Sequence, residues 1–237
     1  MRSKWNKHQI LNMAAKLRAH LPECSPYKRT TLHKMLQRHR IVYAKPDNSS
    51  LGYGVIRIES GPPYMLQSGT RRIRCKSFSS LWRTLQTQMK KRPYILQQGI
   101  ELMTRHGRRF DLRVMVQHSK SESWQVTGDA ARLAPARQII TNISAGGSVV
   151  PLLNLLPDSI STAGKHELSK QCANVALMAS KQLARHLPYL KESGVDLAID
   201  RSRRIWILEL NTRPDTKMFN RLADRSIIEK INRFRSE

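Results

Sequence analysis

The sequence is poor in acidic residues, cysteine and aromatic side chains, and it has no long apolar run. Its 237 residues include 17 Asp and Glu but 42 Lys and Arg, a formal net charge of +25. No stretch approaches the roughly 18–20 apolar residues that a membrane-spanning helix needs. The basic residues 1–24 are interrupted by polar side chains throughout, which argues against a signal peptide.

The cysteines exclude a disulfide framework. Cys24, Cys75 and Cys172 are odd in number and far apart, so a reducing cytoplasm is the expected compartment. Zinc is also disfavoured, because Cys24, His33 and His39 lack the spacing of a zinc site.

The excess of basic over acidic residues has two interpretations. Scattered basic residues are usually a solvated surface, whereas a specific polyanionic partner would also need such a surface. Aromatic residues make up only 6% of the chain, too few for a base-stacking platform, and no nucleic-acid-binding motif is present. Specific nucleic-acid binding is therefore not expected, and an acidic polymer stays open as a partner.

Hydrophobic periodicity predicts helices and antiparallel strands in separate blocks, which is an α+β fold. Helices are expected over residues 4–20, 28–39, 78–91 and 166–187. Strands are expected over residues 40–45, 55–58, 94–98, 110–118, 124–133, 195–200 and 204–210. The 40% hydrophobic content suffices for a buried core.

A strand ending in Lys45-Pro46 precedes a polar loop that contains Ser49, Ser50, Gly52 and Gly54. Small residues let backbone N–H groups approach phosphate oxygens, and a lysine adds a point charge. The segment matches neither the P-loop nor the G-x-G-x-x-G pattern. An ordinary hairpin turn is the alternative.

Three oxygen-bearing side chains come together on the two last strands. Glu209 and Asn211 are two residues apart and share a face, and a hairpin can bring Asp196 beside Glu209. A carboxylate in so apolar a strand needs a partner. Two carboxylates and an amide suit Mg²⁺, while salt bridges to arginine are the alternative.

The strand over 110–118 places Asp111 and Arg113 on one face. An inward arginine needs an anion, and a carboxylate and a phosphate are equal candidates. Arg132, on the strand expected to pair with this one, can join the group.

Taken in order, these segments resemble the ATP-grasp superfamily, and within it the YheC/YheD group described as endospore coat-associated. The resemblance covers about residues 25–220 and rests on five motifs: YAKP with GYG (43–54), YILQQGI (94–100), FDLRVMVQ (110–117), TNISAGG (141–147) and GVDLAID with RIWILELNTRPD (194–215).

The resemblance implies two α+β lobes with antiparallel sheets that clasp ATP. A helical extension over residues 1–27 would precede a small lid lobe over 28–92 and a large lobe over 93–237. The usual N-terminal domain ahead of the core is missing from this sequence. A partner protein that supplies this lobe is thus one expectation.

The resemblance also assigns roles to residues. The expected phosphate, lid and adenine contacts are Lys28 and Lys45; Ser49, Ser50, Gly52 and Gly54; and Gln97, Gln98 and Ile100. Arg113 would face the γ-phosphate, and Arg132 or Asn142 the transferred group or the acceptor. Asp196, Glu209 and Asn211 would hold Mg²⁺.

The implied activity is a ligase that activates a carboxylate as an acylphosphate and then joins it to an amine or thiol. Ala145 stands where related sequences tend to carry a basic residue, a departure that bears on the second half-reaction. The alternative is an ATP-grasp protein without catalysis, with a structural or polyanion-binding role in spore assembly.

Overall fold

The computed structural model describes residues 1–49, 52–89, 92–119, 122–135 and 147–237. The α-helices are α1 (Lys4–Met13), α2 (Ala15–Arg18), α3 (Arg29–Arg38), α4 (Phe78–Met89), α5 (Thr162–Ala184) and α6 (Ser226–Ser236), and short 3₁₀ helices are η2 (Leu152–Asn154) and η3 (Lys217–Arg221). The strands are β1 (Cys24–Pro26), β2 (Ile41–Pro46), β3 (Ile56–Glu59), β4 (Tyr64–Ser68), β5 (Arg71–Cys75), β6 (Tyr94–Gln98), β7 (Thr104–Arg105), β8 (Arg108–Gln117), β9 (Gln125–Leu133), β10 (Ser148–Val150), β11 (Glu192–Ile199) and β12 (Ile205–Asn211).

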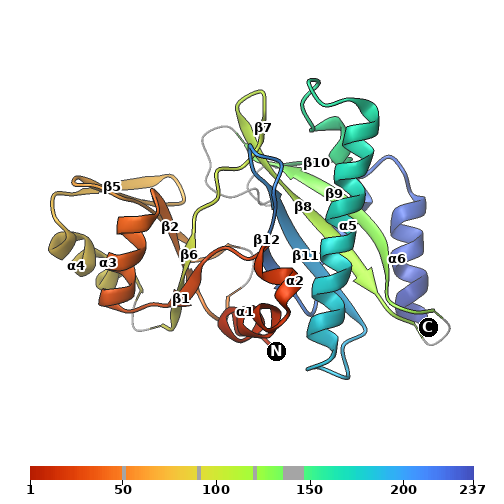
Figure 1. Cartoon of the computed structure of the whole chain (residues 1–237), viewed down its shortest axis with the longest axis horizontal. Coiled ribbons are helices and arrows are strands. Elements are labelled where there is room, and N and C mark those ends of the chain that lie inside the picture. Colours follow the sequence, from red (N-terminus) through yellow and green to blue (C-terminus); the bar gives the residue numbers. More distant parts are fainter. Residues whose placement is uncertain (50–51, 90–91, 120–121, 136–146) are drawn as a thin grey trace.

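The strands form two antiparallel sheets that lie side by side (Figure 1). The first has the order β1-β6-β2-β3-β4-β5, and the second β10-β9-β8-β11-β12, with β7 paired to β8. The predicted α+β fold with antiparallel sheets is therefore confirmed. Among the described helices, none combines the length and apolarity needed to cross a bilayer.

The first sheet is covered by helices on one face. Alternate residues of its strands pack against α3 and α4, and Leu81 and Leu85 are completely buried there. Apolar residues recur every three or four positions along α4, which predicts this buried stripe. On the opposite face, α1 packs near the β1-β6-β2 end, and the same face shares a cavity with the second sheet.

The second sheet is covered on both faces over part of its length. The long helix α5 packs on one face, while η3 and α6 cover one end of the other (Figure 1). Ser161 caps α5 by accepting a hydrogen bond from the Gly164 N–H at 3.2 Å. The part of the sheet that α6 leaves open faces the first sheet.

The N-terminal segment departs from the single helix predicted over residues 4–20. Ala14 adopts an extended conformation and divides it into α1 and α2. The break lets Leu17 enter the core beside α5, where it is 1% exposed. The segment is tied to the second sheet by the Ile207 N–H, which donates to the His20 carbonyl at 2.7 Å.

Replacing Leu81 by alanine should destabilise the first sheet and its helices. The side chain is fully buried, so the loss of contacts and the remaining cavity should cost about 2–5 kcal/mol of unfolding free energy. Urea denaturation followed by tryptophan fluorescence measures it. Arg83→Ala, an exposed position on the same helix, is the control and should change stability by less than about 0.5 kcal/mol. Equal effects of the two substitutions would contradict this packing.

Candidate functional site

A cavity of about 420 Å³ lies between the two sheets. Both sheets and the N-terminal helix contribute to its wall. The polar and apolar lining residues are Lys4, Tyr43, Lys45, Ser49, Gly52, Val55, Gln97, Gln98, Ile100, Leu102, Asp111, Arg113, Arg132, Asp196, Leu208, Glu209, Asn211, Arg213, Pro214 and Asp215. Most of the predicted site residues are thus brought together.

The wall from the first sheet centres on Lys45. Lys45 and Gln97 lie on the adjacent strands β2 and β6, and the Lys45 ammonium donates to Gln97 Oε1. Gln97 Nε2 in turn donates to the Leu208 carbonyl of the second sheet at 3.2 Å. Burial lowers the pKa of Lys45, although the Glu209 carboxylate acts in the opposite direction.

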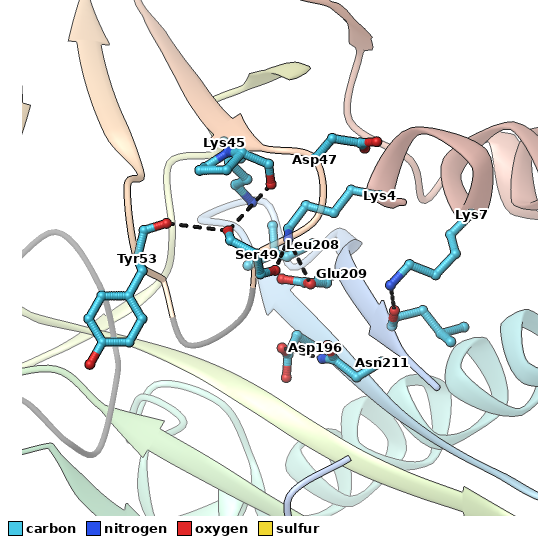
Figure 2. A network of polar contacts seen from close by, with 12 residues as sticks. Lys4, Lys7, Lys45, Asp47, Ser49, Tyr53, Asp196, Leu208, Glu209 and Asn211 are labelled. Atoms are coloured by element: carbon cyan, nitrogen blue, oxygen red, sulfur yellow. Dashed lines mark hydrogen bonds and ion pairs between the residues drawn. The ribbon is translucent and has the colours of Figure 1, made fainter. Parts of the chain in front are cut away.

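The loop after β2 reaches the cavity with Ser49 and Gly52. The Ser49 hydroxyl contacts the carbonyl oxygens of Pro46 and Tyr53 at 3.4 and 3.3 Å (Figure 2). Gly54 supports the loop from outside the cavity lining. Its φ is +75°, and a Cβ there would lie 2.9 Å from the Pro46 ring. Ser50 lies outside the described residues.

The segment after β6 continues the wall. Gln98, the last residue of β6, and Ile100 line the cavity, and Leu102 and Leu208 make this part apolar. The contact of this segment with an adenine ring stays a prediction. Lys28 is different. It is exposed ahead of α3 and is not among the lining residues, so the structure does not bring it to the cavity.

The second sheet forms a floor of paired charges. Its register places Arg113 directly opposite Asp196, and Asp111 opposite Arg132. Arg113 binds Asp196 through two hydrogen bonds of 2.6 and 3.0 Å, and Arg132 binds Asp111 through two of 2.8 and 2.7 Å. Arg132 also lies 2.9 Å from Asp196. In this structure, the anion that Arg113 requires is a carboxylate.

The pairing controls the ionisation of these groups. Burial alone would raise the pKa of Asp196, but Arg113 and Arg132 hold it below its ordinary value. Burial acts to lower the pKa of Arg132, yet Asp111 and Asp196 raise it above its ordinary value. Asp196 is therefore a carboxylate, and the Arg132 guanidinium stays charged.

The predicted magnesium ligands are neighbours. Asp196 pairs with Glu209 across β11 and β12, and Asn211 Nδ2 donates to Asp196 Oδ2 at 3.3 Å (Figure 2). Their oxygen atoms are hard donors that suit Mg²⁺. In the described part of the chain, no three His, Cys, Asp or Glu side chains form a metal-binding group, because the third donor here is an amide. The donor types of the set fit a magnesium ion. Asp196 is also paired with Arg113 and Arg132, so the salt bridge named as the alternative is present in this structure.

Two lysines from α1 complete the site, and the sequence analysis did not identify them. Lys4 Nζ lies 3.5 Å from Glu209 Oε1 and also donates to the Ser49 carbonyl (Figure 2). Lys7 is 6% exposed and donates to the Leu210 carbonyl at 2.5 Å. Burial lowers the pKa of Lys7, opposed by Glu209. A lysine on the apolar face of a helix, three residues before the buried Ile10, was the available signal.

Asn142, predicted to contact the transferred group or the acceptor, lies outside the described residues, as does most of the TNISAGG motif. Arg113, Arg132, Lys45, Glu209 and Asp196 all face one cavity. Such a site combines cations able to bind phosphates with oxygen donors able to hold a divalent metal.

Two curated proteins of Bacillus subtilis (strain 168) are similar to this chain. Endospore coat-associated protein YheD is 28% identical over 229 residues, which are 92% of this chain and 49% of YheD. Endospore coat-associated protein YheC is 22% identical over 93% of this chain and 62% of YheC. The chain thus spans about half to three-fifths of the length of these relatives.

Solved structures share the fold at low sequence identity. D-cycloserine synthetase DcsG matches with a TM-score of 0.60 and 13% identity, over 99% of this chain and 70% of that one. The L-amino acid ligase from Bacillus licheniformis matches with a TM-score of 0.54 and 12% identity, over 90% and 40%. The family model described as YheC/D like ATP-grasp matches residues 1–234. This chain therefore belongs to the YheC/D-like ATP-grasp family, as its sequence motifs predicted.

Proposed function

We propose that this protein is an ATP- and Mg²⁺-dependent ligase that joins a carboxylate to an amine or thiol. The observation that supports this most is the meeting of Lys4 and Lys45 with Asp196, Glu209 and Asn211 in one cavity between two sheets. Membership of the ATP-grasp family supports ATP as the nucleotide. The ligase names of structural neighbours favour this class of reaction.

In this proposal, the apolar residues Leu102 and Leu208 contact the adenine ring and the segment 97–100 offers it backbone groups. Lys45 and the loop over 49–54 bind the phosphates. Lys4 takes the role expected for Lys28, because Lys4 lines the cavity and Lys28 does not. Ammonium groups bind phosphate as point charges and need no fixed orientation.

Asp196, Glu209 and Asn211 would hold the magnesium ion. When bound, Mg²⁺ supplies neutralisation of charge on the β- and γ-phosphates. Lys4 contacts Glu209 from within the cavity wall, and Lys7 donates to the Leu210 carbonyl, so both lysines help to position β12. Glu209 and Asn211 therefore both present their oxygens to the cavity.

Arg113 and Arg132 are placed to bind the anions that react. The γ-phosphoryl group passes from ATP to an oxygen of the substrate carboxylate, which gives an acylphosphate and ADP. An amine or thiol then attacks the acyl carbon and phosphate leaves. Both arginines neutralise charge during transfer, and the main contribution of the protein is positioning.

A spore-associated setting fits the names of the two curated relatives. The substrates and partners of the whole protein are proposals as well, since those relatives are longer than this chain.

Replacing Glu209 by alanine should weaken Mg·ATP binding at least tenfold. The substitution removes one of two carboxylates from the proposed metal site and leaves Lys4 without its partner. Calorimetric titration of Mg·ATP into both proteins measures the change. Chelating Mg²⁺ with EDTA should weaken ATP binding to wild type and narrow the difference between the two proteins.

The matched control is Glu167→Ala, which removes the same charge from the exposed side of α5. This variant should bind Mg·ATP like wild type. If wild type does not bind Mg·ATP at millimolar concentration, the proposed function is wrong. If both variants lose binding equally, Glu209 has no specific role.

Replacing Lys45 by methionine should weaken ATP binding by about tenfold to a hundredfold. Methionine keeps much of the length of the side chain but removes the charge, and hydrogen bonds to charged groups contribute about 1.5–3 kcal/mol. The same calorimetric titration measures it, with Lys34→Met on the exposed face of α3 as the control. If the Lys45 variant binds ATP with unchanged affinity, Lys45 does not bind the phosphates.

A further inference from the structure

The face of the first sheet that turns away from α3 and α4 carries a row of polar side chains. Directly paired residues on adjacent strands point to the same face. The registers of β6, β2, β3, β4 and β5 align one such row: Gln97, Tyr43, Arg57, Gln67 and Arg72. Gln97 and Tyr43 line the cavity, whereas Arg72 lies on the edge strand β5. The row therefore runs from the site to the outer edge of the sheet; Gln97, Arg57 and Gln67 are buried along it, and Arg72 at the edge is exposed.

This face is basic. A second row, through Glu59 and Met65, places Arg74 beside Arg72. We call Arg57, Arg72 and Arg74 the arginine face. Glu59 bonds to Arg57, while Arg72 and Arg74 are exposed and have no ion pair or hydrogen bond within the described part of the chain. The charges on these two rows leave a net charge of two positive units on this face, and the unpaired arginines lie on the edge strand β5.

Arg57 differs from an ordinary surface arginine. It is only 9% exposed, and its Nε is a buried polar atom without a hydrogen-bond partner in the described structure. Buried donors are nearly always paired, so an unpaired one calls for an explanation. Arg57 is separated from β5 by Gln67 of β4, so the guanidinium groups open to an anionic ligand are those of the exposed Arg72 and Arg74.

The chemistry of this face favours one kind of anion. Nucleic acid that binds as a single strand stacks its bases on aromatic side chains. On this face of the described strands, the aromatic residue is Tyr43, which belongs to the cavity wall. Tyr64 and Tyr94 point to the helix-covered face. An extended acidic peptide can instead lie along the open edge of β5. Its alternate side chains have the spacing of a β-strand, which is also the spacing between Arg72 and Arg74.

A second copy of the chain is a poor occupant, because its net charge of +25 is repelled by the arginines. We propose that the arginine face binds an acidic polypeptide segment and that this segment is the carboxylate substrate. Its role as a substrate rests on the proposed function. Its binding to the arginine face does not. Peptide carboxylates pair with Arg72 and Arg74 at the edge, and one carboxylate of the segment reaches the cavity past Tyr43.

The test uses a fluorescent poly-L-glutamate of about 20 residues and fluorescence anisotropy at 0.15 M salt, where generic electrostatic attraction is screened within about 8 Å. Arg72→Ala combined with Arg74→Ala should weaken binding about fivefold to twentyfold. The matched control, Arg71→Ala with Lys34→Ala, removes the same charge from residues that do not belong to the arginine face. Binding by the control should stay within twofold of wild type.

The proposal is wrong if wild type does not bind polyglutamate, or if the two double variants lose affinity equally. It is also wrong if single-stranded DNA of equal charge binds as tightly as polyglutamate and loses as much affinity when Arg72 and Arg74 are replaced. Mg·ATP titration of the same proteins separates this inference from the proposed function. Mg·ATP binding without polyglutamate binding refutes the arginine face alone, and the reverse refutes the nucleotide site alone.

Discussion

The buried carboxylate of Asp196, held between Arg113 and Arg132, is the interaction on which the site depends. A charge buried in a sheet is costly unless it is paired and hydrogen-bonded. The pairing exists only in one register of β9, β8, β11 and β12. A slip of one residue would send each of these side chains to the opposite face, into the core beneath α5. The charged floor and the fold of the second sheet therefore require each other.

The cavity joins two sheets of unlike character. The first sheet and α1 contribute ammonium groups, while the carboxylates come from the second sheet. The contact of Gln97 with the Leu208 carbonyl runs directly between the two sheets, and Lys4 of α1 binds Glu209 of β12. The ammonium groups and the carboxylates attract one another across the cavity. The ammonium groups can also bind a polyanion, and the carboxylates can bind the cation that accompanies it.

Local patterns in the sequence predicted much of this. The stripe of α4 and the alternation along β8 gave helix and strand with the correct faces, and hairpin length correctly placed Asp196 beside Glu209. Lys4 and Lys7 were missed because they are distant in sequence from every residue they contact in the site. The pairing of Arg113 with Asp196 was left open for a similar reason. Periodicity gives the face of a side chain but not its partner.

The first residues of the chain have a practical consequence. The Met1 carbonyl accepts a hydrogen bond from Thr212, which directly follows Asn211 and precedes the cavity-lining Arg213. The C-terminus lies beyond α6, on the other side of the second sheet (Figure 1). An affinity tag or reporter fused ahead of Met1 would emerge at the rim of the site and interfere with ligands there. The C-terminal end is also connected to the site, because Arg235 of α6 donates to the carbonyl of the cavity-lining Pro214 at 3.0 Å.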